Sequence, residues 1–341
     1  MVTSSLRELA DHEGPFASVY IDSAATGDAA PRHRLQRRAV HGILTEKGAP
    51  PPLVAAVDGA LAGLAPGPVG CAVIAARDGV LLTEALPTPP RRQILRLSAL
   101  PYLIPLLGLR QPRTPYVIVL IDRDGADLVA VNGRGERIGD RPWRELRRHT
   151  GESVSHSIAA VAAEATRLAD RAGATLVLVG GAVAERGALT DALAPRGRRI
   201  VALETVTRAS DSDRRTIDVD VRRILREEAE LRRRAVVDCF AQELRRSPAL
   251  AVQGLAATTA ALRAADADVL LVDPERLTDQ KVRVGADPTQ VAPQDIALGH
   301  TWLRRADEAL PLAALASRAD VVPTDRRCLP ADGVGALLRH G

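Results

Sequence analysis

The sequence predicts a mixed α/β (α+β) protein, and three observations lead to this fold class. Short apolar runs of strand length recur along the 341 residues, and segments with helical spacing of apolar residues separate them. Apolar residues make up 46% and charged residues 26%, as is typical of globular proteins. The length indicates two or three domains. We predict an N-terminal α/β domain over 1–112, a central mixed-sheet domain over 113–215 and a C-terminal α/β/α sandwich over 216–341.

The first predicted domain begins with a strand, which two helices and a hairpin follow. The expected elements are a strand over 17–21, helices over 28–47 and 53–64, hairpin strands over 69–75 and 80–86, and a loop or edge strand over 89–92. The expected buried side of the first helix carries Leu35, Ala39, Ile43 and Leu44. Asp78 and Gly79 favour a turn, so they are expected to close the hairpin.

The second predicted domain follows the proline-flanked segment 112–115. Its expected elements are a hairpin over 116–122 and 126–131, a polar Arg-rich loop over 132–155, a helix over 157–172, a strand over 174–179, a helix that ends at 193 and a strand over 199–203. Gly180-Gly181 follows a strand and precedes a helix, but neither the G-x-G-x-x-G spacing nor a G-K-[ST] motif is present. We therefore interpret the two glycines as a tight turn rather than a phosphate loop.

The third predicted domain follows a polar boundary segment over 205–220. We expect a long helix over 219–245, a helix over 254–265, a buried strand over 269–272, an edge strand over 280–284, a helix over 310–317, a short strand at 321–322 and a closing apolar stretch over 333–338. This order of helices and strands is typical of a small α/β/α sandwich.

The composition excludes several classes of function. Aromatic residues make up only 2%, which argues against modules that stack several bases on aromatic rings. Cys71, Cys239 and Cys328 lie far apart, so neither a disulfide framework nor a zinc motif is expected. We predict no cofactor and no metal. The N-terminus has no apolar signal core and the most apolar stretch, 97–109, is too short to span a bilayer, so we expect a cytoplasmic protein without membrane contact.

Arginine clusters are the candidate binding residues. The net charge is +4, which permits a polyanionic partner, and lysine occurs only at Lys47 and Lys281. Solvated surface charge is the alternative interpretation of each cluster. Arginines on a long loop favour contact with RNA phosphates, and we expect no DNA partner. The candidate RNA-binding residues are Arg32, Arg34, Arg37, Arg38, Arg141, Trp143, Arg144, Arg147, Arg148 and His149.

Four segments of the last third of the chain carry a resemblance to a known family. They are Val236-Val237-Asp238-Cys239-Phe240, the run G-L-A-A-T-T-A-A-L over 254–262, the run A-D-A-D-V-L-L-V over 265–272, and D-G-V-G-A-L-L-R over 332–339. These segments resemble the C-terminal domain of archaeal and eukaryotic class-I release factors and of Pelota. The order of elements in the middle block resembles the central domain of that family. The chain is similar to the bacterial branch, which includes Balon-type ribosome hibernation factors.

The resemblance implies a three-domain tRNA mimic that associates with the ribosome under stress, with EF-Tu as a delivery partner. Release factors of this family hydrolyse peptidyl-tRNA with a Gly-Gly-Gln loop. The matching loop here, 139–153, contains neither Gly-Gly nor Gln, and no Gln occurs between 112 and 241. We therefore expect no catalytic residue and an occupant of the A site that hydrolyses nothing.

Two alternatives remain open at this point. A peptidyl-tRNA hydrolase or release factor with a divergent loop would need another group to position water near Gly151, such as Glu152 or His149. An adaptor that binds RNA or protein away from the ribosome would use the third domain.

Overall fold

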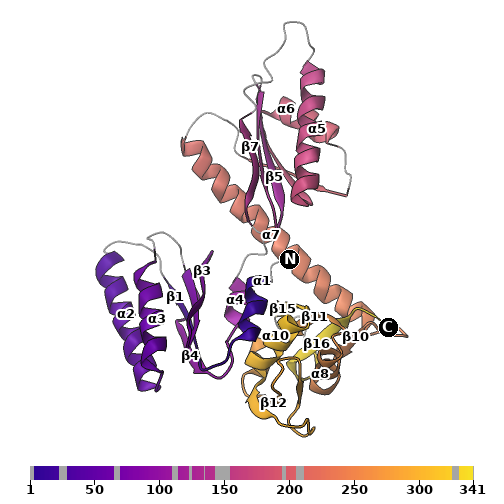
Figure 1. The fold of residues 1–341 in the computed structure, drawn as a ribbon. Coiled ribbons are helices and arrows are strands. Elements are labelled where there is room, and N and C mark those ends of the chain that lie inside the picture. The colour runs from indigo at the N-terminus through magenta and orange to yellow at the C-terminus, as the bar shows by residue number, and fades with distance from the viewer. Residues whose placement is uncertain are drawn as a thin grey trace. The chain divides into compact units, whose positions relative to one another are not determined.

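The computed structural model describes residues 4–22, 29–64, 70–109, 114–122, 125–133, 135–142, 154–193, 197–204, 211–324 and 330–340 (Figure 1). Four β-sheets with helices packed on them confirm the mixed α/β class. The chain divides into two compact units. The central unit lies within Gln111–Arg232, and the two-block unit combines Thr3–Arg110 with Arg233–Gly341. The boundaries of the three domains stay a prediction.

The first block of the two-block unit is built on an antiparallel sheet of order β3-β2-β1-β4. Its elements are α1 (Ser4–Arg7), the 3-10 helix η1 (Glu8–Asp11), β1 (Phe16–Asp22), α2 (Ala29–Glu46), α3 (Pro51–Ala62), β2 (Gly70–Ala76), β3 (Gly79–Leu86), β4 (Ile94–Ser98) and α4 (Ile104–Leu109). The predicted strand, hairpin and two helices are confirmed. The edge strand β4 was not predicted, and 89–92 is a loop.

Helix α2 is rotated relative to the prediction. Leu35 is 65% exposed and Ile43 is 36% exposed, whereas Val40 and Leu44 are fully buried against the sheet. Gln36, which lies one turn before Val40, donates a hydrogen bond from Nε2 to Asp22 O (3.0 Å). The stripe that faces the sheet therefore starts one residue later than the sequence pattern indicates, because the contact with β1 selects the face.

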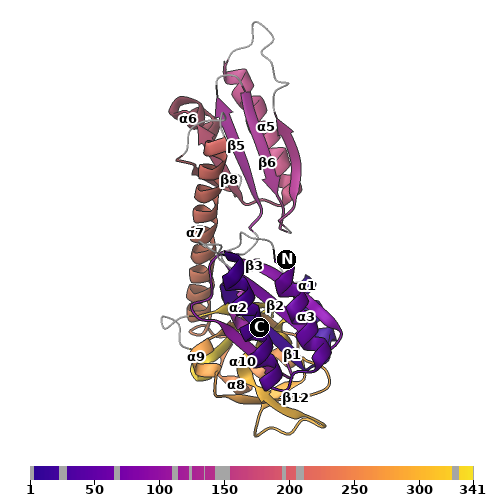
Figure 2. The same cartoon turned by 90° about the vertical axis from the view of Figure 1, so that its left-hand side faces the viewer.

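The second block of this unit contains two sheets. Sheet order β10-β16-β11-β15 combines the parallel pair β11/β15 with the antiparallel strand β16. A small antiparallel sheet, whose strand β12 is labelled in Figure 2, has the order β13-β12-β14. The elements are β10 (Ala251–Gln253), α8 (Leu255–Arg263), β11 (Ala267–Val272), α9 (Pro274–Leu277), β12 (Lys281–Val284), β13 (Val291–Pro293), β14 (Trp302–Arg305), α10 (Ala306–Ala316), β15 (Asp320–Pro323), the 3-10 helix η2 (Ala331–Gly333) and β16 (Val334–Leu338). The segment predicted as an edge strand, β12, is the central strand of its sheet, because β13 and β14 pair with its two sides.

One apolar core joins the two blocks of this unit. Phe16 and Tyr20 on β1 belong to the same buried cluster as Leu270 on β11 and Leu310 on α10. The opposite face of β1, with Val19, packs against α2 and α3. Both faces of the first sheet are therefore buried, and the second block supplies the cover for one of them.

The central unit is a five-stranded mixed sheet with helices on both faces. Its elements are β5 (Tyr116–Asp122), β6 (Gly125–Val131), β7 (Arg137–Pro142), α5 (Val154–Ala172), β8 (Leu176–Gly181), α6 (Val183–Ala192), β9 (Arg199–Ala202) and the first part of α7 (Asp211–Glu243). The strand order is β7-β6-β5-β8-β9. Helices α5 and α6 pack on one face, and Ile217, Val221 and Ile224 of α7 pack on the other.

Helix α7 begins at Asp211, whereas the sequence predicted a polar boundary up to 220 and a helix from 219. Ile217 explains the difference, because this single apolar residue is buried against the sheet and extends the apolar stripe of α7. Near its end, α7 contributes Phe240 to the second block, where an added Cβ at Gly335 would meet the Phe240 ring at 2.5 Å. None of the described helices is long and apolar enough to cross a membrane.

Candidate functional site

The segment that the sequence singles out as an RNA-binding loop starts from the edge of the central sheet. Strand β7 pairs with β6 in antiparallel register, with Arg141 opposite Leu128. Helix α5 begins at Val154. Residues 137–142, which the sequence placed in the loop over 132–155, are therefore strand, which corrects the prediction. Ile138 of β7 packs against the core of the central unit.

Half of the predicted RNA-binding residues follow β7 directly. Trp143, Arg144, Arg147, Arg148 and His149 lie outside the described residues. The backbone of Arg141 belongs to β7, but its side chain is outside the description. Their role in binding RNA stays a prediction that rests on the sequence.

The arginines of α2 are the part of the predicted set that the structure describes. Arg34 and Arg38 are exposed, and Arg37 is half-buried with an Nε atom that lacks a hydrogen-bond partner. The side chain of Arg32 lies outside the described residues. The exposed Leu35 stands between the two exposed arginines in sequence. This surface can offer positive charge to a polyanion, and its function stays a prediction.

The two glycines that resemble a phosphate loop have a structural role. Gly180 and Gly181 are the last two residues of β8, are buried, and pair with Leu120 and Ile121 of β5. Gly181 has φ +145°, and a Cβ at this position would lie 2.2 Å from Ile121 O on the neighbouring strand β5. The close approach of the two backbones therefore excludes a side chain at this position. This agrees with a structural role for the glycines and not with a phosphate loop.

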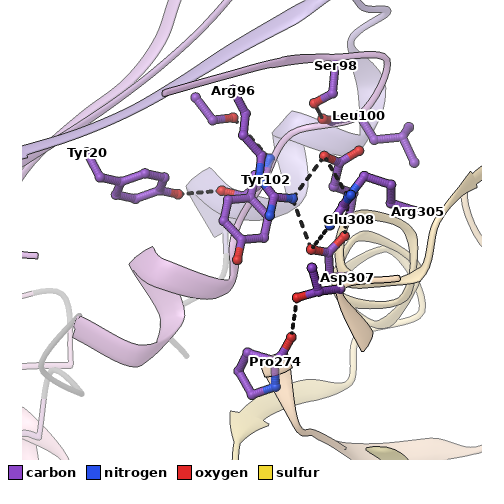
Figure 3. A network of polar contacts seen from close by, with 11 residues as sticks. Tyr20, Arg96, Ser98, Leu100, Tyr102, Pro274, Arg305, Asp307 and Glu308 are labelled. Atoms are coloured by element: carbon purple, nitrogen blue, oxygen red, sulfur yellow. Dashed lines mark hydrogen bonds and ion pairs between the residues drawn. The ribbon is translucent and has the colours of Figure 1, made fainter. Parts of the chain in front are cut away.

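Two buried carboxylates with partly exposed arginine partners, which the sequence did not reveal, lie between the two blocks of the two-block unit (Figure 3). Arg96 of β4 places Nη1 2.9 Å from Asp307 Oδ2 and 3.3 Å from Glu308 Oε1 on α10. Arg305 forms a bidentate pair with Asp307, with both N–O distances at 2.9 Å. The guanidinium carbon of Arg96 lies 3.4 Å from the centre of the Tyr102 ring, which is the geometry of a cation–π contact. We call Arg96, Tyr102, Arg305, Asp307 and Glu308 the interblock network.

The electrostatics of the interblock network follow from burial. The side chains of Asp307 and Glu308 are 0% and 3% exposed, so each carboxylate depends on the two arginines in place of water. Burial, and then the neighbouring Asp307 charge, raise the pKa of Glu308 above its usual value. The hydrogen bond to Asp307 raises the pKa of Arg305. Burial also raises the pKa of Tyr20, whose hydroxyl donates to Tyr102 O at 2.5 Å.

The interblock network fits a structural role better than a chemical one. Both carboxylates are held by arginines, and the described residues contain no group of three His, Cys, Asp or Glu side chains that could hold a metal. One signal in the sequence could have identified it. Asp307-Glu308 opens a helix in which every later residue up to Leu315 is apolar and buried. Two charges in the first turn of such a helix need partners from elsewhere in the chain.

Comparisons with known proteins identify relatives of this chain. The profile of "Bacterial archaeo-eukaryotic release factor family 2" matches residues 115–246, which cover the central sheet and α7. The uncharacterized Mycobacterium tuberculosis protein Rv2629 is 34% identical over 368 aligned residues, which include 100% of this chain and 97% of the relative. The protein MT2704 of another strain of that species matches to the same extent.

Three solved structures match this chain with TM-scores below 0.5. A ribosome-bound archaeal Pelota with ABCE1 matches with a TM-score of 0.43 and 14% identity, over 100% of this chain and 94% of the other. The Archaeoglobus fulgidus Pelota matches with a TM-score of 0.40 and 17% identity, over 80% of each chain. The Saccharomyces cerevisiae protein Dom34 is described as a translation termination-like factor that interacts with Hbs1. It matches with a TM-score of 0.39 and 11% identity, over 80% of this chain and 74% of the other.

Proposed function

The chain belongs to the bacterial archaeo-eukaryotic release factor family, and on this premise we propose that it is a translation factor that binds the ribosomal A site as a tRNA mimic and hydrolyses no peptidyl-tRNA. The family supports a role in translation. In more detail, we propose that the protein acts in the cytoplasm in ribosome hibernation during stress. It would contact ribosomal RNA and be delivered by EF-Tu.

The observation that carries this proposal is the sequence from the second half of β7 up to the start of α5. A hydrolytic loop of the Gly-Gly-Gln type needs two glycines for close backbone approach and an amide side chain beside the attacking water. The segment 139–153 offers neither, since it reads G-D-R-P-W-R-E-L-R-R-H-T-G-E-S. What it offers is arginine and one tryptophan, which suit RNA phosphates and a base.

The charge of this segment sets the expected strength of the RNA contact. Residues 134–148 contain six arginines and three acidic residues, a net charge of +3. Each arginine that neutralises a phosphate adds about 0.7–0.9 to the logarithmic salt slope of binding. A few such contacts give an affinity that falls clearly, though not completely, between about 50 and 200 mM salt.

Co-sedimentation with bacterial ribosomes at these two salt concentrations tests the proposal. We expect the wild type to bind with a stoichiometry near one and to bind less at the higher salt. The variant R144A/R147A/R148A should lose most of this binding. The matched control R77A/R91A/R92A removes three exposed arginines from loops of the first block and should bind as the wild type does.

Two results would overturn the proposal. Failure to bind ribosomes at low salt, both with and without EF-Tu and GTP, would leave the adaptor function as the better hypothesis. Release of formyl-Met from loaded ribosomes by the wild type would show hydrolysis, and its loss in E152A or H149A would assign the water-positioning group.

A further inference from the structure

One aromatic side chain on the small sheet of the second block is exposed to solvent. Among the described aromatic side chains, Phe16, Tyr20, Tyr102 and Phe240 are buried and Tyr116 is partly buried. Trp302, on the edge strand β14, is 44% exposed. A single exposed apolar side chain is common on protein surfaces. It is the groups around Trp302 that indicate a contact surface.

Polar and cationic side chains surround this ring. The His300 ring lies 5.4 Å from Trp302, centre to centre, in an edge-to-face arrangement. The guanidinium carbon of Arg304 lies 5.9 Å from the centre of the Trp302 ring, at the limit of a cation–π contact. Residues 302 and 304 lie on the same face of β14, and Leu303, which is also exposed, lies on the opposite face. Trp302 and Leu303 therefore do not combine into one broad apolar patch.

A hollow of about 570 Å³ adjoins this ring pair through His300. Its lining includes Arg263, Thr289, Gln290 and Thr301, and none of its lining residues is acidic. Arg263 donates from Nη1 to Val291 O (2.5 Å), which fixes the guanidinium at the wall of the hollow. This volume is in the range of sites that hold one nucleotide-sized ligand.

We propose that Trp302 and the adjoining hollow form a binding site for single-stranded RNA. In this site a base stacks on Trp302 beside His300, while Arg304 and Arg263 contact phosphates. Base stacking on an aromatic ring combined with nearby arginines is the usual chemistry of single-stranded RNA recognition. Amide and hydroxyl groups such as those of Gln290 and Thr301 suit the edges of bases. The site is separate from the segment 139–153 and does not depend on ribosome binding.

Fluorescence of Trp302 gives a local readout, because the chain contains only two tryptophans. In the variant W143F, the remaining emission comes from Trp302. We expect a single-stranded RNA of about eight nucleotides to quench this emission in a saturable manner. Quenching should persist in W143F/R144A/R147A/R148A, which separates this site from the proposed ribosome contact. An acidic peptide of equal charge that quenches better than RNA would overturn the proposal in favour of a protein partner.

Substitutions at Trp302 separate stacking from simple hydrophobic contact. Measured by anisotropy of labelled RNA, W302L should weaken binding about tenfold, whereas W302F should weaken it less than about threefold. R304A should lower the salt slope by about one, and R77A, an exposed arginine in the β2–β3 turn, should change nothing. Equal affinities of W302L and W302F, or free AMP binding as tightly as the RNA, would overturn the proposal.

Discussion

In the central unit, the apolar sides of helices cover both faces of one sheet. In the two-block unit, by contrast, two buried carboxylates pair with an arginine about two hundred residues away in sequence. The core of the central unit is made of Val, Leu, Ile and Ala from β5, β6, β8, α5 and α7. The two-block unit adds to its apolar core the contact of Arg96 with Asp307 and Glu308, across 211 and 212 residues of sequence.

This difference shows that clustering of charged residues in the sequence does not indicate which charged side chains stabilise the fold. The arginines of α2 are clustered, and those whose side chains are described are exposed or half-buried. Arg96 stands alone in an apolar strand, and it compensates two buried carboxylates. A charge flanked by apolar residues on a short strand is more informative about structure than a run of exposed charges.

The largest effect is expected for R96A. This substitution leaves the buried carboxylates of Asp307 and Glu308 with one arginine, and should lower the free energy of unfolding of the two-block unit by about 3–5 kcal/mol. Thiol labelling reports this unit locally, since Cys71 is buried and burial raises the pKa of its thiol to about 11. We expect Cys71 to label much faster in R96A than in the wild type.

The neighbouring substitution R92A is the control for this experiment, because Arg92 is exposed in the loop before β4. It should leave the labelling rate of Cys71 unchanged. If R96A also kept the rate of the wild type, the interblock network would contribute nothing to stability, and the comparison between the two units would fail.

The next effect is expected in the central unit. G181A forces a Cβ to within 2.2 Å of Ile121 O at a φ of +145°, and should cost about 1–3 kcal/mol through backbone strain. Hydrogen exchange of the β8 amides should accelerate, while that of the two-block unit should not. G187A is the matched control in α6, where an added Cβ meets nothing within 4 Å and should be neutral or slightly stabilising.

A smaller effect is expected from the ionisation of Glu308. Its pKa is raised in the folded protein, so its contribution to stability is present below its usual pKa and is lost as the pH rises through the raised value. The variant E308Q should therefore gain stability relative to the wild type as the pH rises across this window. Urea titrations of both proteins between pH 4 and pH 8 measure the difference, and a difference that is constant with pH would contradict the assignment.

The smallest effect on stability is expected for R34A/R38A. Both side chains are exposed on α2, and substitutions of this kind usually change the free energy of unfolding by less than about 0.5 kcal/mol. Binding is the property that should change, if this face contacts RNA. Co-sedimentation with ribosomes at low salt should fall for R34A/R38A, while L35A, which keeps both charges, should bind as the wild type does.

The sequence determined those features that depend on neighbouring residues. Apolar periodicity located most strands and helices, because a strand or helix must bury one face wherever it packs. Tyr116–Asp122 and the hairpin of β2 and β3 are examples. The four segments of the last third of the chain also indicated the family, and the family model that matches residues 115–246 confirmed it. The RNA-binding residues of 141–149 stay a prediction.

Only the tertiary structure decided the features that depend on distant partners. Contact with β1 selected the buried stripe of α2, pairing with β13 and β14 made β12 a central strand, and Ile217 reached the sheet and extended α7. The partner of Arg96 lies on α10, and no local pattern relates the two. The physical reason is that burial and ion pairing depend on which surfaces meet in space, and the local sequence specifies only which surfaces are able to meet.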